Sequence, residues 1–122
     1  MKDWTVKQER YLCESVSNRL GELAANLARI TSFSHNDLNR DAVASLIEES
    51  KFFIEWTAAG TGIDQAAELV ELQVQLACWQ LDWQNIWLDD IRRGTVAEQA
   101  KVWSDRVLDM SGLLSEVISA TP

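Results

Sequence analysis

Histidine and cysteine carry much of the catalytic, redox and metal-binding chemistry of proteins, and this chain has one histidine and two cysteines. His35 follows Ser34 and precedes Asp37 at a predicted helix start. Neighbours on a helix start cannot converge on one substrate atom, so these three side chains do not form a catalytic triad. Cys13 and Cys78 form neither a zinc nor a redox motif. We therefore interpret His35 as an exposed turn residue and expect no catalytic residues, metal site or cofactor.

Arg29 precedes the histidine in the segment 29–35, with five residues between the two. This spacing resembles the motif of the HEPN family of helical-bundle nucleases, an arginine and a histidine separated by four to six residues. The resemblance implies that Arg29 and His35 would position and polarise a scissile phosphate in a dimer cleft. Ile30 stands where the family has a polar residue, and the segment follows the first predicted helix rather than lying late in the bundle.

Two acidic pairs suggest a second enzymatic alternative. Glu68 with Glu71, and Asp82 with Asn85, resemble the paired motifs of MazG-like nucleotide pyrophosphohydrolases, which hold Mg²⁺ in a helical bundle. In that family the two motifs face each other from different helices. Here both lie on one predicted helix, which separates Glu71 from Asp82 by about 16 Å. A metal-dependent pyrophosphohydrolase and a HEPN-like ribonuclease are thus the enzymatic alternatives.

The charge balance constrains the partners of the chain. Its 19 acidic and 11 basic residues give a net charge of −8, which disfavours nucleic acid and anionic membranes. A basic protein partner remains compatible with this charge. The sequence begins with a polar amphipathic stretch rather than a signal peptide, and no apolar run is long enough to span a membrane. We therefore expect a cytoplasmic protein with no nucleic-acid or membrane partner.

Helical periodicity extends through almost the whole chain. Apolar residues recur at intervals of three and four, and glycine or capping residues separate the periodic segments. The pattern predicts an all-α single domain over residues 1–122. Short connections favour an up-down-up-down antiparallel four-helix bundle. The four predicted helices span about residues 3–30, 35–59, 62–93 and 96–119.

Capping residues set the predicted helix ends. Ser34 with Asp37 resembles a capping box for the second helix, and Phe33 with Leu38 takes the positions of a hydrophobic staple. The other predicted ends rest on Gly60 as a left-handed terminal residue, Thr61 as the cap of the third helix, Gly94 at its end, and the capping box Thr95 with Glu98 before the fourth.

One apolar stripe on each helix is expected to face a shared core. The predicted stripes combine leucine, valine and aromatic residues at helical spacing. The core residues predicted to be largely buried are Leu20, Leu23, Leu27, Phe53, Leu76, Trp79, Trp103, Val107 and Leu114.

The second and third predicted helices carry more apolar surface than one core needs. A second stripe runs along the third helix through Val70, Val74 and Ala77, and the second helix adds an aromatic pair off its core face. Apolar surface in excess of the core is typical of an interface. Long side chains of neighbouring helices could instead cover this surface within a monomer. The predicted interface residues are Phe52, Trp56, Val70, Val74, Leu81 and Leu88.

Glutamines and tryptophans define one further candidate site on the third helix. Glutamines lie between its two stripes, where they could form a buried polar network or extend to water. Tryptophans spaced four apart would stack along one face and could hold a flat apolar ligand. These candidate pocket residues are Gln73, Gln80, Gln84, Trp79, Trp83 and Trp87.

The combined pattern favours a non-enzymatic function. A small acidic helical bundle with surplus apolar surface and no catalytic motif is suited to protein–protein contact. One self-complementary surface suffices for a twofold dimer, so we expect a homodimer. An enzyme of either resembled family and a binder of a flat apolar ligand are the alternatives.

Overall fold

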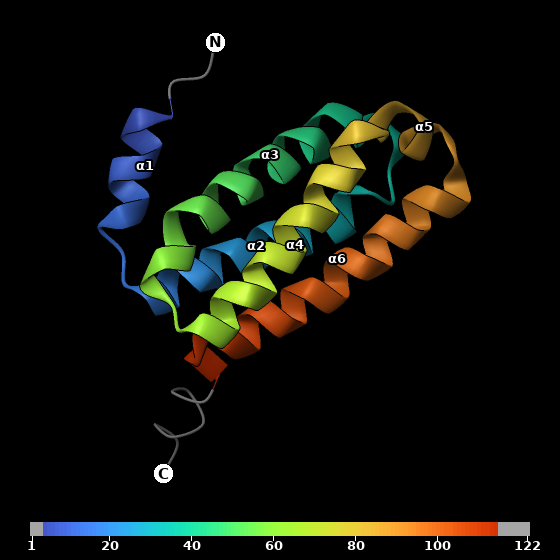
Figure 1. The fold of residues 1–122 in the computed structure, drawn as a ribbon. Coiled ribbons are helices and arrows are strands. Elements are labelled where there is room, and N and C mark those ends of the chain that lie inside the picture. The colour runs from blue at the N-terminus through green and yellow to red at the C-terminus, as the bar shows by residue number, and fades with distance from the viewer. Residues whose placement is uncertain (1–3, 115–122) are drawn as a thin grey trace.

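The computed structural model describes residues 4–114, and 89% of them are helical with no strand. The predicted all-α class is therefore confirmed. The chain forms six helices rather than the predicted four (Figure 1). They are α1 (Thr5–Leu12), α2 (Val16–Phe33), α3 (Arg40–Thr57), α4 (Ile63–Leu81), α5 (Trp83–Leu88) and α6 (Asp90–Ser111), with short 3₁₀ turns η1 (Asp37–Asn39) and η2 (Ala58–Gly60).

The first predicted helix, 3–30, is wrong because the chain breaks between α1 and α2. Ser15 caps α2 by accepting a hydrogen bond from the backbone N–H of Asn18, at 3.1 Å. The Arg19 guanidinium then donates to the backbone oxygens of Leu12 and Glu14, each at 3.0 Å. These bonds satisfy backbone groups that a break in a helix leaves without partners, and they hold α1 at an angle to α2.

The predicted helix 62–93 is also interrupted, at Asp82 and at Asp89. Asp82 leaves the helical region of the backbone (φ −122°, ψ 27°) and separates α4 from α5. The Asp89 carboxylate accepts from the backbone N–H groups of Ile91 and Arg92, at 3.0 and 3.3 Å, and so caps α6. A carboxylate that accepts from two backbone N–H groups strongly stabilises the start of a helix. This cap explains why α6 begins before the predicted residue 96.

The capping box predicted before the fourth helix is therefore wrong. Gly94 and Thr95 lie inside α6, and the Thr95 hydroxyl donates back to the carbonyl of Ile91 at 3.1 Å. A threonine within a helix commonly makes this bond to the residue four earlier. Thr95 thus has no free helix start to cap.

The predicted limits 35–59 of the second helix are also wrong. Ser34 ends α2, where its hydroxyl donates to the carbonyl of Ile30 at 2.6 Å, instead of capping the next helix. Asn36 caps η1 by accepting from the N–H of Leu38, which is 87% exposed and so makes no staple. These local bonds delay α3 to Arg40.

The turn before α4 also differs from the prediction. Gly112 is the one residue within 4–114 that has a positive φ, so Gly60 is not left-handed. The Thr61 hydroxyl donates to the carbonyl of Ala58 at 2.8 Å, and Gly62 takes the capping position of α4. The 3₁₀ turn η2 provides hydrogen-bond partners for backbone groups at the end of α3. A left-handed glycine is therefore not needed there.

Four longer helices enclose the core. α2 packs along both α6 and α3, α3 packs along α4, and α5 packs against the start of α6 (Figure 1). α1 lies on the outside of this group, against α3. The predicted core is confirmed except at Leu114, which is 51% exposed. The buried predicted residues are Leu20, Leu23, Leu27, Phe53, Leu76, Trp79, Trp103 and Val107.

None of the helices formed by residues 4–114 is both long enough and apolar enough to cross a membrane.

Candidate docking surface

The exposed side of α4 carries a continuous apolar stripe. Its two ends are almost fully exposed, at 90% for Ile63 and 88% for Leu81, and Val70 and Val74 are more than half exposed. Successive members are separated by four, three, four, three and four residues. We call this set the outer stripe; its residues are Ile63, Ala67, Val70, Val74, Ala77 and Leu81.

The outer stripe lies opposite the buried face of the same helix. Leu69, Leu72 and Leu76 are fully buried and form the side of α4 that contributes to the core. At 100° per residue, the two sets point about 150° apart around the helix axis. Apolar spacing that alternates three and four is the pattern by which one helix packs along another in a coiled coil. α4 therefore carries one apolar face toward the core and a second apolar face toward the outside.

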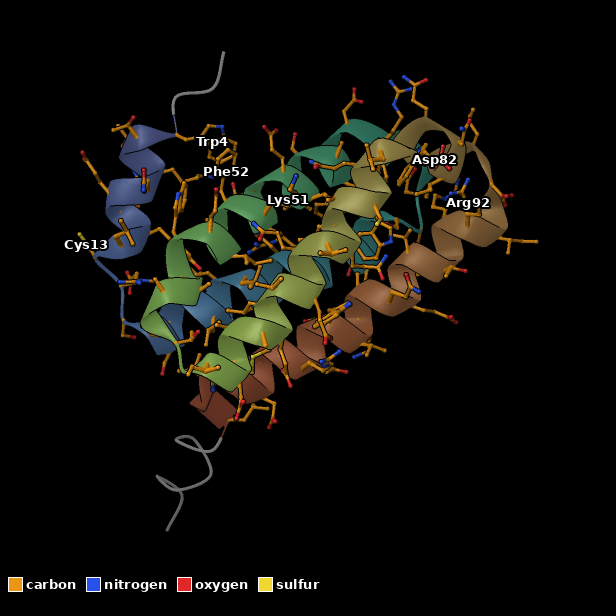
Figure 2. All side chains as sticks on the ribbon, in the orientation of Figure 1. Trp4, Cys13, Lys51, Phe52, Asp82 and Arg92 are labelled. Carbon is orange, nitrogen blue, oxygen red and sulfur yellow. The ribbon has the colours of Figure 1, made fainter. Side chains whose placement is uncertain are left out.

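One edge of the outer stripe carries acidic residues that arginines of α6 partly neutralise. Arg106 lies 3.9 Å from both Glu68 and Glu71. Asp82 pairs with Arg92 at 2.6 Å, and the two lie close together at the same end of the molecule in Figure 2. A hydrogen bond from Asn85 and the contact with Arg92 hold the pKa of Asp82 below its usual value.

The other edge borders an open hollow of about 550 Å³ between α3 and α4. Phe52 and Val74 contribute apolar walls to this hollow. Lys51 crosses it and donates to the Gln80 side chain at 2.7 Å, while Gln73 lies 3.5 Å from the carbonyl of Lys51. Gln80 and Gln84 are exposed and Gln73 is half-buried. The glutamines thus lie at the margin of the apolar surface.

The predicted interface residues fall into separate groups. Val70, Val74 and Leu81 belong to the outer stripe, while Leu88, 82% exposed, lies on α5 beyond the break at Asp82. Ile63 and Ala67 extend the stripe but were missed by sequence reasoning, because the start of the helix was interpreted only as a capping site. The continuing interval of four and three was the signal that could have found them.

Phe52 and Trp56, the remaining predicted interface residues, lie under α1. The Trp4 ring centroid is 4.5 Å from that of Phe52 and 6.4 Å from that of Trp56. Figure 2 shows Trp4 directed from the start of α1 toward Phe52 on α3. The ring centroid of Tyr11, at the end of α1, lies 5.7 Å from that of Trp56. Helix α1 therefore covers much of this aromatic pair within the chain.

The three tryptophans of the predicted ligand site do not form one exposed ridge. Trp79 and Trp87 are buried, and the break at Asp82 places them on different helices. The Trp87 indole donates to the backbone carbonyl of Asp37 at 2.8 Å. The ring centroids of Trp83 and Trp87 are 5.3 Å apart. The indole nitrogen of Trp83 has no hydrogen-bond partner among residues 4–114. Their packing contributes mainly to the core.

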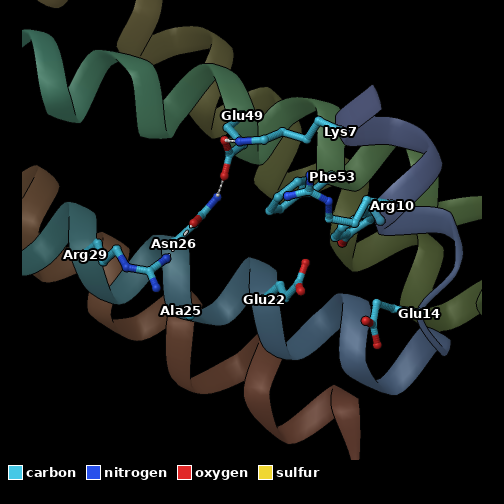
Figure 3. Close-up of a pocket in the computed structure, with 10 residues that line it drawn as sticks. Lys7, Arg10, Glu14, Glu22, Ala25, Asn26, Arg29, Glu49 and Phe53 are labelled. Carbon is cyan, nitrogen blue, oxygen red and sulfur yellow. Dashed lines mark hydrogen bonds and ion pairs between the residues drawn. The ribbon is translucent and has the colours of Figure 1, made fainter. Parts of the chain in front are cut away.

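The residues of the HEPN-like segment face different hollows. Arg29 donates to the Asn26 side chain at 3.0 Å, beside a hollow of about 320 Å³ between α1, α2 and α3 (Figure 3). His35, which is exposed, instead borders an open hollow against the first half of α6. The fold therefore does not bring Arg29 and His35 to one cavity. Cys13 and Cys78 are both exposed and free.

The hollow under α1 contains a chain of polar contacts. Lys7 on α1 pairs with Glu49 on α3, and Glu49 accepts from the buried Asn26 side chain at 3.0 Å (Figure 3). Glu22 points into the same hollow from α2. Burial raises the pKa of Glu22, and the neighbouring carboxylates of Glu14 and Glu49 raise it further.

Within residues 4–114, no three histidine, cysteine, aspartate or glutamate side chains gather closely enough to hold a metal ion. Compared with protein-family models, curated proteins and solved structures, the chain matches none of them. The surface of α4 is therefore the feature from which a function has to be argued.

Proposed function

We propose that the protein is non-enzymatic and acts through protein–protein contact, as a homodimer that pairs through the outer stripe of α4. The observation that carries this proposal is an exposed apolar stripe with coiled-coil spacing on the side of α4 opposite the core. An uncovered stripe of this length would be unusual for a monomer.

A second copy in antiparallel orientation matches the stripe residue by residue. With the twofold axis crossing the outer stripe at the level of residue 72, each pair of facing residues has side chains of similar size. Ala67 and Ala77 have small side chains, so they allow the two helices to approach closely. This pairing places Ile63 of one copy opposite Leu81 of the other, Ala67 opposite Ala77, and Val70 opposite Val74.

The charges beside the stripe are compatible with self-pairing. In the antiparallel orientation, Glu71 of one copy comes near Glu71 of the other. Arg106 of each copy lies 3.9 Å from its own Glu71 and offsets this repulsion. Exposed charges further than about 8 Å apart are screened at physiological salt, so the net charge of −8 opposes pairing only weakly.

The support for this surface is an up-down-up-down antiparallel bundle of α2, α3, α4 and α6, which we propose as the topology of the chain. Short connections at residues 34–39, 58–62 and 82–89 favour it. A rigid bundle keeps α4 straight and keeps its outer side free of other segments of the described chain.

Val74→Glu tests the proposal, because it places a charge at the centre of the pairing surface. The wild type should give a dimer mass by light scattering at micromolar concentration, and Val74→Glu should give a monomer mass. Gln75→Glu adds the same charge to α4 away from the stripe and should remain dimeric. A wild-type monomer mass that persists as the concentration rises would rule out the homodimer and leave a basic helical protein as the partner to test.

A further inference from the structure

We propose that α1 exchanges between two copies of the chain, with residues 13–15 as the hinge. In the exchanged form α1 and α2 become one straight helix, and α1 docks on α3 of the second copy. The docking surface is the aromatic face of α3 formed by Phe52, Phe53 and Trp56. This inference concerns a different surface from the outer stripe and does not rest on it.

The first support is that α1 binds α3 as an amphipathic helix binds a groove. Trp4 and Tyr11 are seven residues apart, so both project from one side of α1 two turns apart. Trp4 contacts Phe52 at 4.5 Å, and the Tyr11 ring stacks on Phe53 at 4.1 Å between centroids. These anchors show which helix fits the aromatic face of α3, and every copy of the chain carries that helix.

The polar contacts of α1 are divided between α3 and α2. Lys7 pairs with Glu49, and the Thr57 hydroxyl donates to the Tyr11 oxygen at 3.1 Å. The Tyr11 hydroxyl reaches α2 through the Arg19 carbonyl, at 2.8 Å. The Arg19 guanidinium also donates to the Leu12 carbonyl, at 3.0 Å, in a bond that belongs to the hinge. The hollow of about 320 Å³ in Figure 3 lies between α1, α2 and α3. Exchange of α1 would keep its contacts outside the hinge and transfer them to the other copy.

The hinge sequence can form a helix. Residues 3–20 contain no glycine and no proline, and the interval of four from Leu12 to Val16 and Leu20 continues the α2 pattern across the break. The break is held by the Ser15 cap and by the two bonds from Arg19. A straight helix would replace these with ordinary backbone bonds. Short connections of this kind favour exchange of an identical element between copies.

Cross-linking between two differently marked full-length chains tests the exchange. Both chains carry Cys13→Ser and Cys78→Ser; one also carries Lys7→Cys and the other Glu49→Cys. The two are mixed, incubated and treated with a short bismaleimide. Exchange predicts a cross-linked heterodimer, and Arg19→Ala, which releases the hinge, should raise its yield. As a geometric control, a single chain with both new cysteines should cross-link to itself.

Two outcomes would overturn the exchange. One is that the doubly substituted chain cross-links internally while the mixed chains yield no heterodimer. The other is that adding Val74→Glu to both chains abolishes the heterodimer, since the copies would then be adjacent only through α4. Persistence of the heterodimer in the Val74→Glu background supports exchange and separates it from failure of the α4 dimer, which light scattering measures independently.

Discussion

The rings of Tyr11 and Phe53 stack with 4.1 Å between their centroids and 9° between their planes. The Tyr11 hydroxyl donates to the carbonyl of Arg19, and it accepts from the hydroxyl of Thr57. Burial raises the pKa of Tyr11 above its usual value, so the phenol keeps the proton that it donates. This one side chain therefore joins α1 to both α2 and α3.

Tyr11→Phe should lower the free energy of unfolding by about 1–3 kcal/mol, because it leaves buried polar partners without the hydroxyl that joins them. Urea denaturation followed by circular dichroism measures the loss. Val6→Ala on the exposed side of the same helix serves as the control, since Val6 is 58% exposed, and should change stability by less than about 0.5 kcal/mol. Equal effects of the two substitutions would show that the hydroxyl contacts do not stabilise the docked α1.

Asp89→Ala should lower the free energy of unfolding by about 0.5–2 kcal/mol, because it removes the acceptor for the backbone N–H groups of Ile91 and Arg92 in the first turn of α6. Thr95→Ala is the matched control. Thr95 lies within α6 and bonds to a carbonyl that the helix already uses, so its loss should cost clearly less. Thermal or urea unfolding compares the two. A larger loss for Thr95→Ala would place the helix start at residue 96 after all.

Leu76→Ala should cost about 2–5 kcal/mol, because Leu76 is fully buried and its truncation leaves a cavity. Leu114→Ala removes the same atoms from a side chain that is 51% exposed, and it should cost less than about 1 kcal/mol. The midpoint of urea unfolding measures both. Similar losses at the two positions would contradict the burial that distinguishes them.

Glu22→Gln should change how stability depends on pH. The folded state raises the pKa of Glu22 above its ordinary value of 4.5, so the folded state binds this proton more tightly than the unfolded state. The resulting stabilisation is complete below the unfolded pKa and is lost as the pH rises through the folded pKa. From about pH 4 to about pH 7, the wild type should therefore lose stability relative to Glu22→Gln. Parallel pH profiles from urea unfolding would contradict this prediction.

The buried faces of the helices could be predicted because apolar periodicity records them directly. Leu23, Leu76 and Val107 recur at helical intervals within their segments, and all three are fully buried. The breaks at residues 13–15 and at Asp89 could not be predicted in the same way. They depend on side chains that satisfy backbone groups, and the Arg19 bonds become visible only once the chain has turned.

The candidate surface was predictable in part for the same physical reason. Val70, Val74 and Leu81 follow a repeat along one helix, and the structure leaves all three exposed. Phe52 and Trp56 follow a similar pattern, but α1 turns back from a distant part of the sequence and covers them. A pattern within one helix does not reveal which other segment packs on it.

The position of α1 also determines when its contacts can form during synthesis. Its partners on α3 come 42 residues after Lys7, at Glu49, and 46 residues after Tyr11, at Thr57. The ribosome therefore releases α1 and α2 before the aromatic face of α3 exists. During that interval the Ser15 cap and the Arg19 bonds can already form the bend at residues 13–15, whereas the rings of Trp4 and Tyr11 still lack the aromatic rings of α3 on which they pack.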